Sequence, residues 1–297
     1  PEELENKKIS IHFGGVYMNA EVFVNGRSVG IQPYGYSPFY FDISEYLKFG
    51  EQNVITVKVD NSEEINSRWF SGSGIYRHVK IQVNNPLHFE TNGVAINASE
   101  VDKNKASVHI SPAIINETKT IQEYRVTASV ETEEETFKSE LALKNAPGEI
   151  RKGTLALELL NPRLWSPANP NLYTLKLAIK NAEGKTVDEV EETFGIRTID
   201  YNSKDGFVLN GKSVLINGGN MHHDNGALGA AAFDRAEIRK VQLLKDAGFN
   251  SVRTSHNVPS EIFLKACDSI GLLVIDEAFD GWRTEKNTYD YARFFDL

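Results

Sequence analysis

Hydrophobic and polar residues alternate in short runs from residue 1 to about residue 200. In NVITVKVD, the residues Ile55, Val57 and Val59 occupy one set of alternate positions and polar residues occupy the other. A period of two is typical of a strand with one buried face. Asn25-Gly26 stands between two further runs and has the composition of a tight hairpin turn. The pattern therefore predicts antiparallel β structure.

A second group of alternating runs follows Asn84-Asn85-Pro86, which is the first expected boundary between domains. The runs are SVHISPAII, YRVTASVET, TFKSELALK, GTLALELL and LYTLKLAIK. Turn-forming residues return about every ten positions, as expected of a β-sandwich of roughly 100 residues. Two all-β modules are therefore expected before any helix.

After about residue 205 the pattern changes to strands that alternate with helices. Another hairpin, at Asn210-Gly211, leads into a strand, and FDRAEIRKVQLLKDAG then has apolar residues at helical spacing. Asp234 with Glu237 resembles a capping box at the start of this helix, and Gly248 is a candidate left-handed stop.

Three further segments complete the pattern. FNSVRTS is expected to be a strand, and PSEIFLKACDSIG is expected to be a helix that ends at Gly271. LLVIDEAF is expected to be a third strand, and its apolar start suits burial on both faces. The order β-α-β-α-β predicts right-handed crossovers and a parallel sheet.

Polar side chains follow each of the three expected parallel strands. In an α/β barrel, ligand-binding groups collect at the carboxyl ends of the strands. Because these ends share one face, the polar groups are expected to converge on one cleft. They are Asn220, His222, His223 and Asp224 after the first strand, Arg253, His256 and Asn257 after the second, and Asp276, Glu277, Asp280 and Trp282 after the third.

The composition limits the classes of function. The 297 residues predict two or three domains, and the hydrophobic and charged contents of 40% and 25% are typical of a soluble globular protein. A net charge of −9 argues against nucleic acid and anionic membranes as main partners. The single cysteine, Cys267, cannot form an internal disulfide and is expected in the core. With no membrane span or signal peptide evident, a soluble cytoplasmic or periplasmic location is expected, and the choice between them is open.

Several motifs resemble those of glycoside hydrolase family 2, the group of β-galactosidases, β-glucuronidases and β-mannosidases. NSVRTSH and CDSIGLLVIDE are similar to the family's signature around barrel strands two and three. AEVFVNGRSVG and SRWFSGSGIYRHV resemble its sugar-binding domain, and NPRLWSPANPNLY and FGIRTID resemble its immunoglobulin-like domain and the exit from it. GGNMHHDNGALGAA and RTSHNVPSE are most similar to the β-galactosidase branch. One departure is RTSHNVP, where many members have a shorter loop with Tyr directly before Pro.

The resemblance implies a multidomain fold. Residues 1–85 would form an incomplete, jelly-roll-like β-sandwich that binds sugar, and residues 86–200 would form an immunoglobulin-like β-sandwich. Residues 201–297 would form about the first three strands of a (β/α)8 TIM barrel, which needs roughly 250 residues when complete. The chain is therefore interpreted as a central part of a larger enzyme.

The resemblance also implies a mechanism, which is retaining hydrolysis by two carboxyl groups. In the family these are glutamates after barrel strands four and seven. Both are expected beyond Leu297, so no catalytic residue is expected in this chain, and the chain alone is expected to be inactive.

The resemblance assigns sugar binding to His222 and His256. An imidazole offers one donor and one acceptor to hydroxyl groups. The alternative is loop histidines that bond to nearby backbone. His223, Asp224, Asn257 and Asp280 are further candidates for sugar contact. Trp282 is a candidate stacking platform for a pyranose ring, with rim packing as the alternative.

Other residues are expected around the substrate. Arg68 and Trp69 could reach the cleft from the first β domain, although a packed Trp with a surface Arg is the slightly favoured interpretation. Arg253 could orient a catalytic carboxylate or pair with Asp276 or Glu277. These two acids are adjacent on a strand and point to opposite sides, so they are rejected as the catalytic pair and are expected to support the site from behind.

Three functions stay open. The first is a retaining exo-β-glycosidase, most like a β-galactosidase, with β-glucuronidase or β-mannosidase specificity as alternatives. The second is a non-catalytic carbohydrate-binding or scaffold module, and the third is a metal-dependent hydrolase. The spacing of the histidines matches no standard metal pattern, so no metal site is expected in the chain. No cofactor is required, a cation in the full enzyme is left open, the expected partner is a β-galactoside or related glycoside, and a homo-oligomer is left open.

Overall fold

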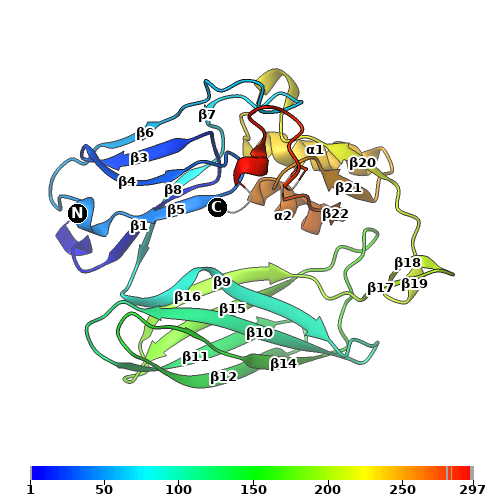
Figure 1. Ribbon diagram of the computed structural model, residues 1–297. Helices are drawn as coiled ribbons and strands as arrows, with labels where there is room; N and C mark the ends of the chain where they lie inside the picture. Colours follow the sequence, from blue (N-terminus) through cyan, green and yellow to red (C-terminus); the bar gives the residue numbers. More distant parts are fainter. Residues whose placement is uncertain (1, 279, 282, 295–297) are drawn as a thin grey trace. The chain divides into compact units, whose positions relative to one another are not determined.

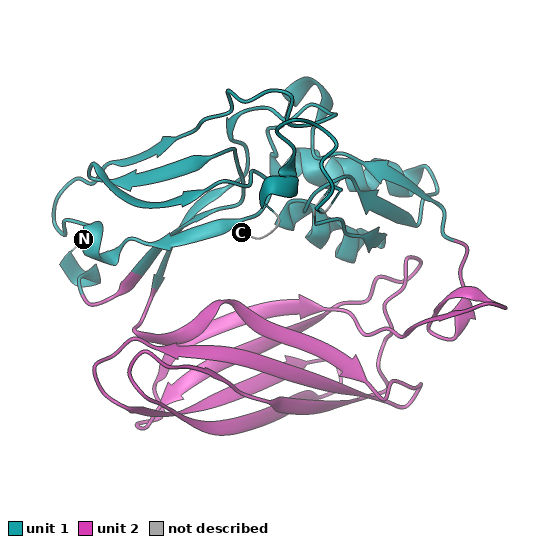
Figure 2. Cartoon of the chain, viewed as in Figure 1, with its two compact units in different colours: residues 1–5, 9–83, 216–297 teal, residues 6–8, 84–215 magenta. Residues whose placement is uncertain are grey.

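The computed structural model describes residues 2–278, 280–281 and 283–294. They form two compact units, shown in different colours in Figure 2. Unit 1 contains residues 1–5, 9–83 and 216–297, and unit 2 contains residues 6–8 and 84–215. The first and last of the three predicted regions therefore belong to one packing unit.

The N-terminal part of unit 1 is built from short antiparallel strands (Figure 1). They are β1 (Lys8–Phe13), β2 (Val16–Tyr17), β3 (Ala20–Val24), β4 (Arg27–Gln32), β5 (Phe39–Asp42), β6 (Ile55–Lys58), β7 (Gly74–Ile75) and β8 (Val79–Asn84). Two three-stranded sheets have the orders β5-β1-β8 and β4-β3-β6, and β2 pairs with β7. Ile11 and Phe13 of β1 and Val22 and Val24 of β3 are almost fully buried in one core. The predicted β-sandwich is confirmed.

Both predicted Asn-Gly hairpins are confirmed. The turn between β3 and β4 has φ of 52° at Asn25 and 79° at Gly26, as a type I′ turn requires. Asn25 also accepts a hydrogen bond from the Val54 amide at 3.0 Å, which ties the turn to the segment before β6. Asn210 and Gly211 have φ of 52° and 73°.

The alternating pattern of β6 correctly predicts the burial of only some of its apolar residues. Val57 packs against the core, but Ile55 is 39% exposed. β6 lies at the edge of its sheet, and Ile55 is its first residue, so cover from neighbouring strands ends there.

Unit 2 is a sandwich of antiparallel sheets around one core. Its strands are β9 (Leu87–Ser99), β10 (Lys105–Asn116), β11 (Gln122–Glu131), β12 (Thr136–Asn145), β13 (Ile150–Lys152), β14 (Leu155–Leu160), β15 (Tyr173–Asn181), β16 (Thr186–Phe194), β17 (Ile199–Asn202), β18 (Gly206–Leu209) and β19 (Lys212–Ser213). One sheet has the order β13-β10-β14, with β9 also paired to β10, and the facing sheet has the order β12-β11-β15-β16. Val108, Ile110, Val126 and Leu175 are fully buried between them. The predicted immunoglobulin-like sandwich is confirmed.

A buried asparagine joins three segments of unit 2. The Asn145 side chain is fully buried, and its Nδ2 donates to the carbonyl oxygens of Ile114 and Glu149 at 3.0 and 3.2 Å. Its Oδ1 accepts a hydrogen bond from the Tyr124 hydroxyl at 2.7 Å. Because the Asn145 side chain is buried, the loss of its hydrogen bonds destabilises the fold.

The C-terminal part of unit 1 is a parallel α/β segment. The strands β20 (Gly218–Met221), β21 (Ser251–Thr254) and β22 (Leu273–Ile275) pair in parallel in chain order. The helices are α1 (Asp234–Asp246) and α2 (Glu261–Ile270). Val241 of α1, Phe263 and Cys267 of α2, and Val252 of β21 pack in one core. This confirms the predicted start of a TIM barrel and the core position of Cys267.

Short 3-10 turns connect these elements. They are η1 (Glu2–Leu4), η2 (Ser44–Tyr46), η3 (Gly226–Leu228) and η4 (Tyr291–Phe294). The last turn, at the red end of the ribbon in Figure 1, brings Tyr291 to the aromatic side chains of the first strands.

The ends of the two helices confirm and correct the sequence analysis. α2 ends as predicted at Gly271, which has a left-handed φ of 91°. The capping box predicted for α1 is wrong, because the N-cap is Phe233 and no side chain caps the helix. Glu237 is instead buried and bonds to other residues. The expectation that β22 is buried on both faces is also wrong, since Ile275 is 55% exposed.

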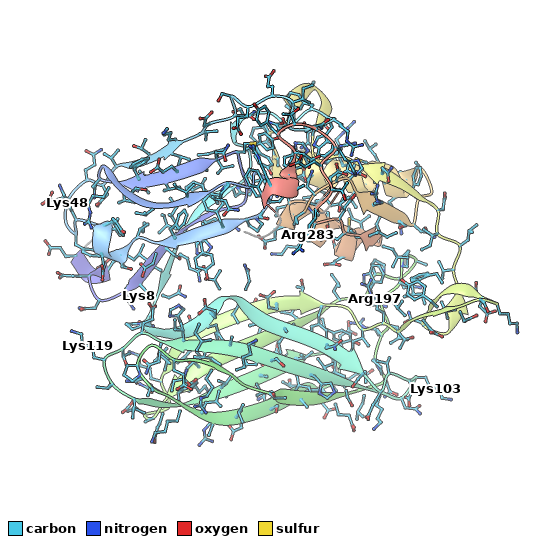
Figure 3. The ribbon with its side chains drawn as sticks, viewed as in Figure 1. Lys8, Lys48, Lys103, Lys119, Arg197 and Arg283 are labelled. Atoms are coloured by element: carbon cyan, nitrogen blue, oxygen red, sulfur yellow. The ribbon has the colours of Figure 1, made fainter. Side chains whose placement is uncertain are left out.

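Charged side chains cover the outer surfaces of both units. Lys48, Lys103 and Lys119 lie in loops and are exposed (Figure 3). Among the residues that the structure describes, none of the helices combines the length and the apolar character needed to cross a bilayer.

Replacement of Asn145 tests the buried network of unit 2. We expect Asn145→Ala to lower the free energy of unfolding by about 3 kcal/mol, because it removes all three hydrogen bonds of this buried side chain. Tyr124→Phe removes one hydrogen bond and is the matched control, with an expected loss of about 1 kcal/mol. Urea unfolding followed by circular dichroism measures both. Equal losses in the two variants would contradict the account.

Candidate functional site

Two histidines and one tryptophan meet beyond the carboxyl ends of the parallel strands. His222 follows β20 and His256 follows β21, and their ring centroids are 5.4 Å apart with an interplanar angle of 80°. Trp69, in the loop between β6 and β7, lies 5.7 Å from the His222 ring and 5.0 Å from the His256 ring between centroids. The structure thus brings together two of the predicted strand-end histidines. We refer to His222, His256 and Trp69 as the His-Trp cluster.

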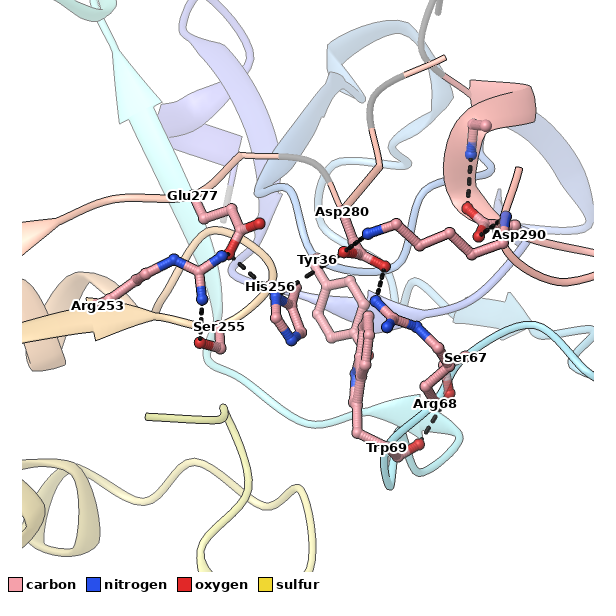
Figure 4. A network of polar contacts seen from close by, with 12 residues as sticks. Tyr36, Ser67, Arg68, Trp69, Arg253, Ser255, His256, Glu277, Asp280 and Asp290 are labelled. Carbon is pink, nitrogen blue, oxygen red and sulfur yellow. Dashed lines mark hydrogen bonds and ion pairs between the residues drawn. The ribbon is translucent and has the colours of Figure 1, made fainter. Parts of the chain in front are cut away.

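His256 continues into a chain of charged groups (Figure 4). Its Nδ1 lies 3.1 Å from Glu277 Oε2 and 3.8 Å from Asp280 Oδ1. The same Glu277 oxygen lies 2.7 Å from a guanidinium nitrogen of Arg253. Arg253 therefore forms an ion pair with Glu277, one of the two partners considered from the sequence. Asp276 has a different partner, because its Oδ1 accepts a hydrogen bond from the Thr254 hydroxyl at 2.9 Å.

Among these charged groups Asp280 is the most buried, at 3% exposed. Its Oδ2 lies 2.6 Å from Arg68, and its Oδ1 lies 2.6 Å from Lys286 Nζ. Burial alone raises the pKa of Asp280, but the hydrogen bonds from Lys286 and Arg68 outweigh burial and hold the pKa below its ordinary value. Asp280 is therefore ionised at neutral pH and joins the loop of Arg68 to the segment after β22. The ion chain consists of Arg253, Glu277, His256, Asp280, Arg68 and Lys286.

Trp69 is held by tyrosines of unit 1. Its indole Nε1 donates a hydrogen bond to the Tyr36 hydroxyl at 2.9 Å (Figure 4). Tyr36 also packs edge-on against Tyr291, whose hydroxyl lies 2.7 Å from that of Tyr17. Burial raises the pKa of Tyr17, Tyr36 and Tyr291 above the ordinary value, so all three are neutral phenols at physiological pH. The Trp69 indole is therefore packed against uncharged aromatic side chains.

His223 and Asn257 are more deeply buried than the three residues of the His-Trp cluster. His223 is 9% exposed and packs edge-on against Tyr36 and Tyr76, with centroids 5.0 and 5.9 Å apart. Burial lowers the pKa of His223 to about 4, so the ring is neutral at physiological pH. Asn257 is 2% exposed. Both residues line a cavity of about 10 Å³, which has room for about one water molecule.

The remaining predicted residues have less defined surroundings. Asp224 is half-buried, and its backbone oxygen accepts a hydrogen bond from Lys240 at 3.5 Å. Trp282 lies outside the described residues. The Arg68 side chain is partly exposed to solvent, and it also forms an ion pair with Asp280.

A metal ion is the chemical alternative for part of the ion chain. One donor atom from each of His256, Glu277 and Asp280 lies within 4.8 Å of the others. Glu277 already contacts Arg253, however, and Asp280 contacts two further cations. A divalent ion at this position would lie beside three positive side chains. The donor set is therefore better satisfied by hydrogen bonds within the protein.

Comparisons with known proteins identify the family. The family model described as the sugar binding domain of glycosyl hydrolases family 2 matches residues 1–86. The model described as glycosyl hydrolases family 2 matches residues 88–197, and that of the family's TIM barrel domain matches residues 202–287. The chain belongs to glycoside hydrolase family 2.

Relatives in family 2 carry more than one name. A β-galactosidase of Bacteroides ovatus is 42% identical over 97% of this chain, and a putative β-glucuronidase of Formosa agariphila is 40% identical over 97% of it. A crystal structure of a family 2 member from Bacteroides cellulosilyticus matches 99% of the chain with a TM-score of 0.95 and 44% identity. The chain spans 34%, 27% and 38% of the lengths of these three proteins, respectively.

Several residues that build this family 2 site carry no recognisable signal in the sequence. Lys286 contacts Asp280, and Tyr36 holds Trp69, but neither residue belongs to a motif or a periodic pattern. Arg77 is buried at 8% exposed and donates to the Val258 carbonyl at 2.9 Å, next to His256 and Asn257 in the chain. It is the last residue of GIYR in the motif SRWFSGSGIYRHV, and the motif alone gave no signal of that contact.

The low pKa of His223 predicts acid sensitivity of unit 1. A histidine whose folded pKa lies near 4, below its unfolded value near 6.5, contributes stability that is full above pH 6.5 and is lost as pH falls toward 4. We expect this loss to reach about 3 kcal/mol. His223→Phe keeps a buried ring without titration, so its stability relative to wild type should rise by about 2 kcal/mol between pH 7 and pH 4.5, which is most of the full loss.

Urea midpoints of both proteins at the two pH values measure this difference, because all other titrating groups are shared. His109→Gln, at an exposed position of β10, is the control. The same difference in stability between wild type and His223→Phe at both pH values would show that His223 is not the acid-sensitive group.

Proposed function

We propose that this chain forms the glycone-binding part of the active site of a retaining exo-β-glycosidase that removes terminal β-galactosyl groups. The observation that supports the proposal is the His-Trp cluster at the carboxyl ends of β20 and β21. Two imidazoles provide hydrogen bonds for sugar hydroxyls, and an indole provides an apolar surface for a pyranose ring. Convergent polar groups beside an aromatic surface are typical of small-ligand sites.

The two histidines have complementary hydrogen-bonding roles in this proposal. His256 Nδ1 faces the Glu277 carboxylate, so Nδ1 carries the proton and Nε2 is left to accept a hydrogen bond from a sugar hydroxyl. Burial and then the neighbouring His256 lower the pKa of His222, so His222 is neutral at physiological pH. A neutral imidazole at His222 suits the uncharged hydroxyl groups of a hexose.

The hydrolysis itself needs a proton donor and a nucleophile. The donor protonates the glycosidic oxygen as its bond to the anomeric carbon breaks, and the nucleophile bonds to that carbon. Water then cleaves the glycosyl-enzyme bond and returns its proton to the first carboxylate. We assign both roles to glutamates of the enzyme that lie beyond Leu297 and not to residues of this chain.

Within the ion chain, Glu277 and Asp280 are two neighbouring carboxyl groups. Their oxygen atoms lie within 4.8 Å, a separation near that of retaining carboxyl pairs. Asp280, however, is held ionised by Arg68 and Lys286, and Glu277 is occupied by Arg253 and His256. Neither carboxyl group is placed to donate a proton, so we assign both to orientation of His256.

β-Glucuronidase activity is the second candidate, because the relative from Formosa agariphila is named a putative β-glucuronidase. A glucuronide carries a carboxylate that requires a cation. Among the described residues of the ion chain, Arg253 contacts Glu277, and Arg68 and Lys286 contact Asp280. A substrate carboxylate would compete with these internal partners, which favours a neutral glycone.

A panel of chromogenic glycosides on the full-length enzyme tests the proposed substrate. We expect kcat/KM for an aryl β-galactoside to exceed that for the matching β-glucuronide and β-mannoside by about 10²-fold. Residues 1–297 alone are the control and should give no turnover above buffer. A preference for the glucuronide would reject the galactoside assignment. Absence of any glycoside turnover would favour a binding or scaffold module, and activity that is lost with chelator would favour a metal-dependent hydrolase.

The His-Trp cluster makes a separate prediction about one residue. His256→Ala in the full-length enzyme should lower kcat/KM by about 10²-fold, or about 3 kcal/mol, because hydrogen bonds to the glycone are lost. His109→Ala, at an exposed position in unit 2, should have no effect. Steady-state kinetics on the preferred glycoside measures both variants. If His256→Ala matched the His109→Ala control, His256 would lie outside the site.

A further inference from the structure

A buried ion pair lies behind the site on helix α1. Glu237 and Lys240 are one helical turn apart, with Oε1 and Nζ separated by 2.9 Å and side chains that are 4% and 14% exposed. Charged groups are rarely buried to this extent unless several partners replace water. The other partners of the pair therefore indicate what the pair does.

Glu237 bonds to two segments that carry the site residues. Its Oε1 accepts a hydrogen bond from Asn225 Nδ2 at 2.8 Å, and Asn225 lies in the loop that begins with His222. Its Oε2 accepts a hydrogen bond from the Ser260 hydroxyl at 2.6 Å. Ser260 is the N-cap of α2 and ends the segment that contains His256. One carboxylate thus contacts both histidine-bearing loops.

Lys240 supports the first loop through its backbone. Its Nζ donates to the carbonyl oxygens of His223 and Asp224 at 3.4 and 3.5 Å. The same ammonium lies 5.5 Å from the centroid of the Phe263 ring. Phe263 belongs to α2 and packs in the core that this helix shares with α1 and β21. The pair therefore connects the backbone of the first loop to α2 across the interior of unit 1.

A small cavity lies beside the ion pair. Glu237, Lys240, Ser260 and Phe263 line this cavity of about 10 Å³, whose other walls include His222 and Asn257. The hydrogen bonds of Glu237 to Asn225 and Ser260 therefore add to the packing of the core in fixing the two loops. Burial raises the pKa of Glu237, but Lys240, Ser260 and Asn225 outweigh burial and keep it below its ordinary value, so the group is a carboxylate at neutral pH.

We propose that Glu237, supported by Lys240, is a positioning residue of the glycone site, which fixes the separation of His222 and His256 by holding both of the loops that carry them. The inference rests on the proposed glycosidase function for its catalytic consequence. The structural consequence is independent of the proposed function, because the contacts of Glu237 predict restricted motion of both loops whatever the substrate.

The test uses the full-length enzyme with Glu237→Gln, which keeps the shape of the side chain and removes its charge. Glu261→Gln is the matched control, because Glu261 forms an exposed pair with Lys265 on α2. We expect Glu237→Gln to raise KM for the preferred glycoside and to lower kcat/KM by about 10-fold to 10²-fold. Glu261→Gln should remain within about twofold of wild type.

Hydrogen exchange of backbone amides provides the readout that does not depend on activity. In Glu237→Gln, amides of residues 222–231 and 255–260 should exchange faster, whereas those of unit 2 should be unchanged. If wild type hydrolyses no glycoside, the proposed function fails, and the exchange data alone decide the positioning role. If wild type is active but Glu237→Gln has the kinetics and the exchange pattern of Glu261→Gln, the positioning role is overturned. A lower melting temperature with unchanged KM and unchanged loop exchange would also overturn it.

Asn225→Ala keeps the inference testable if Glu237→Gln does not fold. This variant removes the bond between Glu237 and the first loop, together with the bond of Asn225 to the Ala231 carbonyl, and it leaves the bond between Glu237 and Ser260 in place. Faster exchange in residues 222–231 but not in residues 255–260, together with a higher KM, would support the positioning role. Unchanged exchange and unchanged KM would reject it.

Discussion

The site depends above all on the buried carboxylate of Asp280. Arg68 from the first β module and Lys286 from the segment after β22 both bond to it at 2.6 Å, and His256 lies next to it. A buried carboxylate is stable only with such partners, so the segments that supply them must come together when unit 1 folds. This requirement places Trp69, which follows Arg68 directly, against the two histidines. The sandwich and the parallel strands therefore form one site because a single charge needs partners from both.

Two further layers fix the cluster from different directions. Tyrosines of the first β module pack near Trp69, and its indole Nε1 donates a hydrogen bond to Tyr36. On the other side, Glu237 and Lys240 bond to the loops that follow β20 and β21. The first layer is neutral and aromatic, and the second is charged and bonds mainly to backbone and small polar groups. Together they explain how two histidines in flexible-looking loops acquire a defined separation in this family 2 protein.

Local patterns predicted the elements well, and distant contacts could not be predicted. Asn-Gly pairs located the hairpins, because only a few residues tolerate positive φ, and Gly271 located the end of α2. Convergence of His222 and His256 followed from the shared edge of parallel strands. The contacts of Lys286 with Asp280 and of Trp69 with Tyr36 join residues that belong to no common period. Glu237 was misread as a cap, since spacing alone does not tell which way a side chain turns.

The central claim is that His222, His256 and Trp69 together receive the glycone of a β-galactoside. A crystal structure of the full-length enzyme with a galactose-configured inhibitor tests it most directly. The account predicts that ring nitrogens of both histidines lie about 3 Å from hydroxyl groups of the sugar, with the indole of Trp69 in contact with the sugar ring. An inhibitor bound away from these three side chains, with His256 still paired only to Glu277, would contradict it.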